Sequence, residues 1–168
     1  MLRFLISHRG NMRGRLEGRE NEPIYIDDAI TKGFNVEVDA WVLPEKKNII
    51  SLGHDNPQYD VTYDFFIDRV DKLWIHCKNI DSLEEFQSNA ELSKCNYFWH
   101  EGDTVTLTSK GYIWAHVGRQ PIKHSIAVMP EIYNEDISEC IGTCSDYIEK
   151  YKNEKNSSFA VWSPKKYG

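Results

Sequence analysis

The sequence has no long hydrophobic run and no concentration of basic residues. No stretch approaches the roughly 18 apolar residues of a transmembrane helix, so we expect no membrane span. Lysine and arginine total 20 against 26 acidic residues, which gives a net charge of −6, and the basic residues form no cluster. Nucleic-acid binding requires a basic face, so we expect no nucleic-acid partner.

Cysteine is also scarce, with four residues at Cys77, Cys95, Cys140 and Cys144. The last two lack the two-residue spacing of a zinc knuckle. The N-terminal segment 1–6 is a brief apolar run without a small-residue cleavage site, so we interpret it as a strand and not as a signal peptide. We therefore expect a cytoplasmic protein whose cysteines are reduced thiols in or near the core.

The chain of 168 residues is long enough for one domain with a substantial core. We assign residues 1–152 to this domain. Residues 153–168 have weak periodicity, and we interpret them as a C-terminal extension.

Short apolar segments alternate with polar or amphipathic ones, which is typical of an α/β protein. We expect strands at 3–7, 35–41, 48–52, 73–77, 96–99, 105–108, 111–115, 125–129 and 139–142, and helices at 24–32, 60–69, 81–92 and 145–153. Only nine residues separate Ala115 from Ser125. A parallel crossover usually needs a dozen or more residues and a helix, so the C-terminal half must lack some helices.

The first third of the chain carries a series of polar motifs: Ser7-His8-Arg9-Gly10, Arg19-Glu20-Asn21, Glu37-Val38-Asp39 and Gly53-His54-Asp55. Histidine transfers protons near neutral pH. Two carboxylates two residues apart on a strand point to the same face and can hold a hard metal ion. Proton-transfer groups beside a divalent metal are what phosphodiester cleavage requires. The metal would also supply the positive charge that an acidic protein needs in order to bind an anion.

The order and spacing of these motifs resemble the glycerophosphodiester phosphodiesterase family. The wider superfamily includes the phosphatidylinositol-specific phospholipases C and the sphingomyelinase D toxins. The resemblance rests on His8-Arg9-Gly10, Glu20-Asn21, Glu37-x-Asp39, His54-Asp55 and a strand ending at Lys78. It covers residues 3–80, and the segment 142–147 is similar to the final strand and turn of such enzymes.

The resemblance implies a TIM barrel whose active site lies at the C-terminal ends of the strands. Such barrels typically have about 250 residues, so this chain resembles a shortened member. We therefore expect an abridged TIM-barrel-like α/β fold with some helices missing in the C-terminal half.

The resemblance also implies roles for individual residues. His8 and His54 would be the catalytic acid–base pair. Arg9, steadied by Glu20, and Lys78 would bind the substrate phosphate. His100, Glu101 and His116 follow expected strands and are further candidates for the site.

The expected cofactor is a divalent metal, Mg²⁺ or Ca²⁺, bound by Glu37 and Asp39. The third strand of the family usually carries an acidic ligand two residues before the lysine, and here His76 occupies that position. Imidazole favours Mn²⁺ or Zn²⁺ over Ca²⁺. The site would then use His76 with a transition metal, recruit Glu101 or Glu131, or be inactive.

These observations predict hydrolysis of a small glycerophosphodiester-like or related alcohol phosphodiester. Two alternatives stay open. One is a lyase that releases a cyclic phosphate, and the other is a phosphate-ligand binding domain without turnover.

Overall fold

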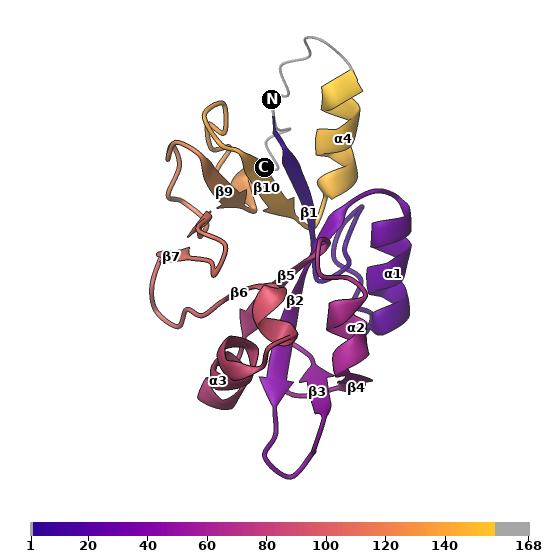
Figure 1. Ribbon diagram of the computed structural model, residues 1–168. Helices are drawn as coiled ribbons and strands as arrows, with labels where there is room; N and C mark the ends of the chain where they lie inside the picture. Colours follow the sequence, from indigo (N-terminus) through magenta and orange to yellow (C-terminus); the bar gives the residue numbers. More distant parts are fainter. Residues whose placement is uncertain (1, 157–168) are drawn as a thin grey trace.

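The computed structural model describes residues 2–156, with side chains as far as residue 152 (Figure 1). Within this range the strands are β1 (Phe4–His8), β2 (Asn35–Val42), β3 (Ile49–Leu52), β4 (Tyr59–Thr62), β5 (Leu73–Cys77), β6 (Asn96–Phe98), β7 (Val105–Leu107), β8 (Ile113–Ala115), β9 (Ser125–Val128) and β10 (Gly142–Ser145). The helices are α1 (Pro23–Thr31), α2 (Tyr63–Ile67), α3 (Ile80–Ser88) and α4 (Ile148–Asn156), with short 3₁₀ turns η1 (Leu92–Lys94) and η2 (Pro130–Ile132).

One sheet contains all of these strands. Seven of them run parallel in the order β6-β5-β2-β1-β10-β9-β8. Strands β3 and β4 extend antiparallel from the C-terminal half of β2, and β7 pairs antiparallel with β8. The C-terminal ends of the seven parallel strands therefore meet along one edge of the sheet.

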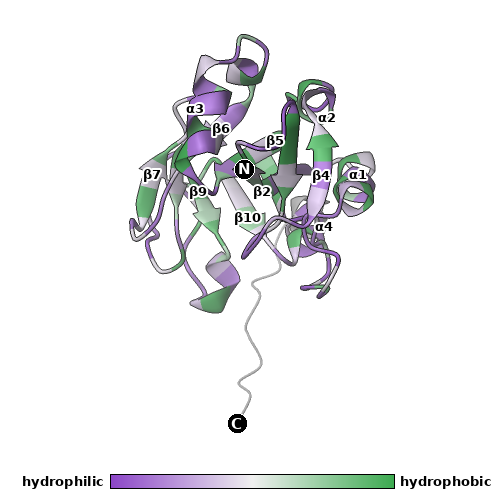
Figure 2. Ribbon diagram, turned by 90° about the horizontal axis from the view of Figure 1, so that it is seen from below, coloured by the Kyte–Doolittle hydropathy of each residue, from purple (hydrophilic) through white to green (hydrophobic). Residues whose placement is uncertain are grey.

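Two hydrophobic clusters lie on the two faces of this sheet. One joins the outward face of β2 and β5 to the helices, and includes Val38, Ile75 and Phe86. The other covers the opposite face and includes Ile6, Phe98 and Trp114. Figure 2 shows green, hydrophobic segments among the strands. Strand β5 contributes to both clusters.

The sheet curls, because strands at opposite ends of the parallel series meet. The rings of Phe98 on β6 and Trp114 on β8 have centroids 4.6 Å apart. Between these ends the backbone N–H of Ser109 donates to Tyr97 O at 2.8 Å, and Thr106 Oγ1 donates to Trp99 O at 3.0 Å. No ladder joins β6 to β7 or β8 in residues 2–156, so the sheet does not close into the expected barrel.

The C-terminal half has few helices, as its short connections predict. Between β6 and β10 the described chain has only the 3₁₀ turn η2 and no α-helix. Figure 1 shows α1, α2 and α4 on one side of the sheet, while β7 and β9 lie away from them. The tight turn at residues 108–112 reverses the chain direction, so β7 pairs antiparallel with β8. A parallel crossover between these two strands would need a longer connection.

The α/β class is confirmed, and most of the expected elements are present within a residue or two. The helix expected at 60–69 is wrong at its start, because residues 59–62 pair with β3 as strand β4 before α2 begins. The final strand lies at 142–145 and not 139–142, where Phe4 and Ile126 leave no room for a side chain at Gly142. Helix α4 starts at residue 148 and crosses the boundary expected at 152, and the extension beyond 156 lies outside the described residues.

Helix α3 shows how one cap fixes a boundary. The Asn79 side chain accepts from the backbone N–H of Ser82 at 3.1 Å, and the backbone N–H of Asn79 donates to Ser82 Oγ at 3.3 Å. This reciprocal pair satisfies two N–H groups at the helix start. The helix therefore begins at residue 80, one residue before the expected start.

The four cysteines are free and buried, as expected. Among the described residues, no helix is both long enough and apolar enough to cross a membrane.

Candidate functional site

Polar side chains converge where the parallel strands end. His8 is the last residue of β1, and Glu37 and Asp39 project from β2. Asp39 is in register with His76 on β5, and Lys78 follows that strand. Because alternate residues of a strand share a face, these side chains all point to the inner face of the curled sheet.

Asp39 is the centre of this cluster and is fully buried. Its Oδ2 accepts from Asn21 Nδ2 at 2.9 Å and lies 3.0 Å from Arg9 Nε, in an ion pair without hydrogen-bond geometry. Its Oδ1 lies 3.1 Å from His76 Nδ1 and 3.6 Å from Lys78 Nζ. Burial alone would raise the pKa of Asp39, but the His76 hydrogen bond and the Arg9 charge outweigh it, and the pKa lies well below its usual value.

The turn after β1 brings Arg9 and Asn21 to this carboxylate. Arg9 has a left-handed backbone (φ 54°), and its N–H donates to Glu37 O at 3.0 Å. The N–H of Asn21 donates to Arg9 O at 3.0 Å. At Gly10 (φ 92°) a Cβ would lie 2.6 Å from the Tyr25 ring, so the turn requires glycine.

Glu37 lies beside Asp39 but has little to balance its charge. It is 3% exposed, and its Oε2 has no hydrogen-bond partner among the described residues. The same oxygen lies 3.9 Å from His8 Nε2. Burial, followed by the negative charge of Asp39, raises the pKa of Glu37.

One ligand atom each from Glu37, Asp39 and His76 lie within 4.8 Å of one another. The buried Glu37 oxygen without a partner is the observation that fits a cation at this point. Two carboxylates and an imidazole are a donor set suited to Mn²⁺ or Zn²⁺, and with added water to Mg²⁺.

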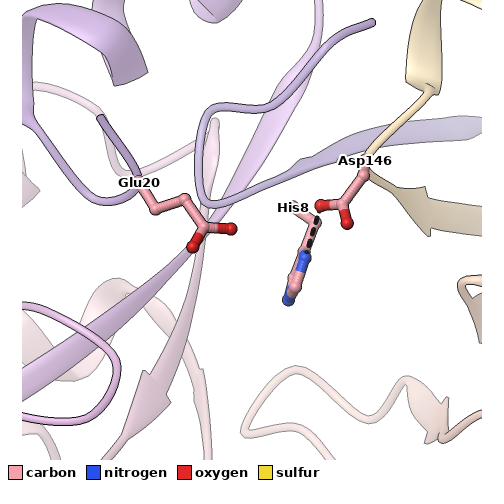
Figure 3. A group of neighbouring side chains, drawn as sticks. All are labelled: His8, Glu20 and Asp146. Carbon is pink, nitrogen blue, oxygen red and sulfur yellow. Dashed lines mark hydrogen bonds and ion pairs between the residues drawn. The ribbon is translucent and has the colours of Figure 1, made fainter. Parts of the chain in front are cut away.

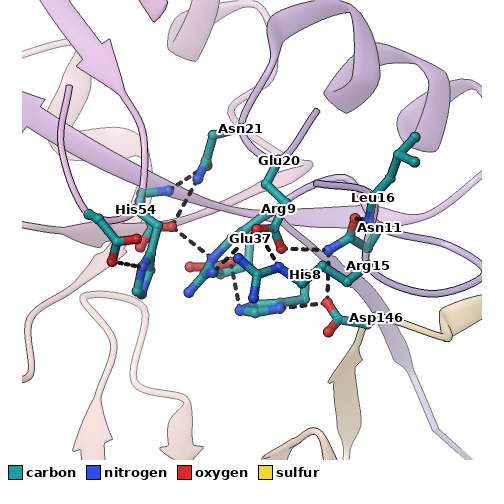
Figure 4. A network of polar contacts seen from close by, with 12 residues as sticks. His8, Arg9, Asn11, Arg15, Leu16, Glu20, Asn21, Glu37, His54 and Asp146 are labelled. Carbon is teal, nitrogen blue, oxygen red and sulfur yellow. Dashed lines mark hydrogen bonds and ion pairs between the residues drawn. The ribbon is translucent and has the colours of Figure 1, made fainter. Parts of the chain in front are cut away.

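His8 is held on the other side of Glu37. Its Nδ1 lies 2.7 Å from Asp146 Oδ1 (Figure 3). Asn11 Nδ2 donates to the same oxygen at 2.9 Å (Figure 4). An ionised carboxylate only accepts, so Nδ1 carries the proton and Nε2 faces Glu37. Burial opposes protonation, but the Asp146 hydrogen bond and the Glu37 charge outweigh it and raise the pKa of His8.

Glu20 completes this side of the network. Its Oε1 accepts from Asn11 Nδ2 at 2.9 Å, and its Oε2 lies 3.0 Å from Arg15 Nε and 3.8 Å from the Arg9 guanidinium. Figure 4 shows Glu20 in this network together with Asn11, Arg9 and Arg15. Glu20 thus lies within ion-pair distance of both arginines.

His54 lies on a loop at the rim of the site. Its Nδ1 is 2.7 Å from Asp55 Oδ1, and 39% of its side chain is exposed. Trp41 Nε1 donates to Gly53 O and anchors the loop. Burial lowers the pKa of His54, and the charge of Arg9 adds to this. Figure 4 shows His54 and His8 on opposite sides of Arg9.

An open pocket of about 290 Å³ adjoins the cluster. It is lined by His54, His76, Cys77, Lys78, Trp99, His100 and Glu101. Trp114 lies in the core. Glu131 does not line this pocket, and its carboxylate accepts from Ser145 Oγ and Tyr151 Oη.

Comparison with protein-family models, with curated proteins and with solved structures finds no match to this chain.

The structure brings the expected site residues to one edge of the sheet, with His54 at its rim. The sequence interpretation assigned no role to Asn11, Asn21 or Asp146. Asp146 directly follows β10, which pairs with β1, so its position after a parallel strand was the signal that could have identified it. The two asparagines lie in an irregular loop, where no periodicity marks them.

Asp146→Asn is expected to lower the pKa of His8. The neutral amide removes the strongest group that favours the imidazolium, and burial then dominates. NMR titration of the His8 side chain measures this shift, with exposed His124 as an internal reference. An unchanged His8 pKa would contradict the Asp146 contact.

Proposed function

We propose that this protein is a metal-dependent phosphodiesterase acting on a small glycerophosphodiester-like or related alcohol phosphodiester. The observation that carries the proposal is the position of His8. Its Nε2 faces the unpartnered oxygen of Glu37, while Asp146 holds its Nδ1. A buried histidine with one nitrogen fixed and the other directed at a cluster of potential metal ligands is suited to general acid–base catalysis.

His8 and His54 would divide the proton transfers. One imidazole accepts the proton of the attacking water or hydroxyl, and the other donates a proton to the leaving alcohol. Their positions on opposite sides of Arg9 support this division (Figure 4). Arg9 and Lys78 would hold the phosphate oxygens between them. Both are cations that form ion pairs with Asp39, which places them beside each other.

Glu37, Asp39 and His76 would hold the divalent metal. When bound, the metal would polarise the phosphoryl oxygens and offset the charge of the transition state. We further propose that the curled open sheet is an abridged relative of the TIM barrel, because its polar site lies at the C-terminal strand ends as in that fold.

A binding domain without turnover is the second candidate. Its support is Asp39, whose two oxygens already contact Arg9, Asn21, His76 and Lys78. Such a carboxylate organises two cations for phosphate binding even without a metal.

Hydrolysis of glycerophosphodiesters and bis(p-nitrophenyl) phosphate, with Mg²⁺, Ca²⁺, Mn²⁺ or Zn²⁺ against EDTA, tests the proposal. We expect turnover only with metal, and Glu37→Gln is expected to abolish both turnover and thermal stabilisation by the metal. Glu84→Gln, an exposed residue on α3, is the matched control. Phosphorus NMR separates a monoester product from the cyclic phosphate of a lyase. Tight diester binding without turnover under any metal would favour the binding domain.

A further inference from the structure

Two histidines from the second half of the chain lie beside the proposed catalytic groups and have no role in the mechanism above. His100 is two residues beyond Phe98 of β6, and His116 is two residues beyond Trp114 of β8. Phe98 and Trp114 both belong to the inner cluster, so alternation directs the two histidines to the same inner face.

The imidazoles form a row with His76. The His76 and His100 rings stack with centroids 4.4 Å apart and planes 6° apart. The His100 and His116 rings have centroids 5.8 Å apart. The row thus extends from a proposed metal ligand across the mouth of the curled sheet, on the side formed by β6 and β8.

The protein leaves hydrogen-bonding capacity in this row unused. His100 Nδ1 is buried and has no hydrogen-bond partner among the described residues. Stacking, and not a hydrogen bond from Nδ1, therefore holds this ring. No carboxylate forms an ion pair with His100 or His116 within the described chain, in contrast to the pairing of His8 with Asp146.

We propose that His100 and His116 form a subsite for the alcohol portion of the substrate, and that this alcohol is an uncharged, sugar-sized polyhydroxy group. An imidazole without a charged partner offers one N–H donor and one nitrogen acceptor, which matches a hydroxyl group. Lys78 and Arg9 mark the phosphate end of the site, so the row lies where the ester-linked alcohol would extend. This inference rests on the proposed function for the position of the phosphate.

Two features favour a small uncharged occupant. Glu101 on the pocket wall repels a second anionic group. The pocket volume of about 290 Å³ is at the lower limit of small-molecule sites, which start near roughly 300 Å³. A single sugar or sugar alcohol suits this space.

Binding of product analogues tests the inference without requiring turnover. Sorbitol 6-phosphate, methyl phosphate and pyrophosphate are titrated into the protein in EDTA, with affinities from calorimetry. Wild type is expected to bind sorbitol 6-phosphate at least tenfold more tightly than methyl phosphate. His100→Phe, which keeps the stacked ring, and His116→Ala are expected to reduce this ratio toward one without changing the affinity for methyl phosphate. His124→Asn, at an exposed position, should change neither affinity.

Equal binding of the two monophosphates by wild type would overturn the inference, as would a preference that survives both substitutions. Tighter binding of pyrophosphate than of sorbitol 6-phosphate would overturn the choice of an uncharged group. Failure of the proposed function is a separate result, because an inactive protein can still show the sugar preference and an active one can lack it.

Discussion

Replacing His8 is expected to lower kcat for the diester by about 10²–10⁴-fold, the usual contribution of a general acid or base. His8 is 8% exposed, and Asp146 fixes the direction of its ring. Among the described residues Asp146 pairs with no other imidazole, so we expect no neighbouring histidine to take over the proton transfer of His8. Steady-state kinetics with the metal that supports the highest rate provide the measurement.

His8→Asn is the preferred variant, because its amide can still donate to Asp146 and preserve the network. Thermal unfolding of the variant shows whether the fold is retained. His54→Asn is expected to produce a loss of similar size, while His124→Asn is expected to be neutral. A folded His8→Asn protein with wild-type kcat would remove His8 from the mechanism.

Replacing Asp39 with asparagine is expected to reduce the free energy of unfolding by about 3–5 kcal/mol, the range for removing one partner of a buried ion pair. The substitution leaves Arg9 and Lys78 with their charges largely buried, at 13% and 16% side-chain exposure. It also weakens the contact with His76. Urea unfolding in EDTA measures the loss without any contribution from bound metal.

Glu37→Gln is the matched control, and the opposite sign is expected. The folded protein raises the pKa of Glu37, so its charged form is less favourable in the folded chain than in the unfolded chain. Removing that charge is expected to stabilise the metal-free protein by about 1 kcal/mol at neutral pH, the lower range for an unsatisfied buried group. The gain should vanish as pH falls below about 4.5, the ordinary value of this carboxyl, because Glu37 is then protonated in both states.

Equal destabilisation by the two substitutions would contradict the structure, in which the Asp39 charge is balanced by cations and the Glu37 charge is not. Addition of metal is expected to stabilise wild type and to have little effect on Glu37→Gln.

Local patterns in the sequence predicted most of the strands and the edge at which the site lies. Asp39 and His76 could be placed at neighbouring strand ends because each follows an apolar, alternating segment. The helix expected at 60–69 was wrong because residues 59–62 satisfy their backbone groups by pairing with β3, and that pairing depends on a distant segment.

The contact of Asp146 with His8 was missed for a similar reason. A carboxylate 138 residues from His8 acquires its partner only when β10 pairs with β1. The row formed by His76, His100 and His116 likewise depends on the curling of the sheet, which brings β6 close to β8.

The sequence by itself determined the α/β class, the scarcity of helices after β6 and the residue types available for chemistry, because these follow from periodicity, connection length and side-chain identity. The tertiary structure decided that the sheet curls without closing, that Asp39 is balanced while Glu37 is not, and which nitrogen of His8 faces the site. Those outcomes depend on burial and on contacts between distant strands. Neither is set by the local order of residues along the chain.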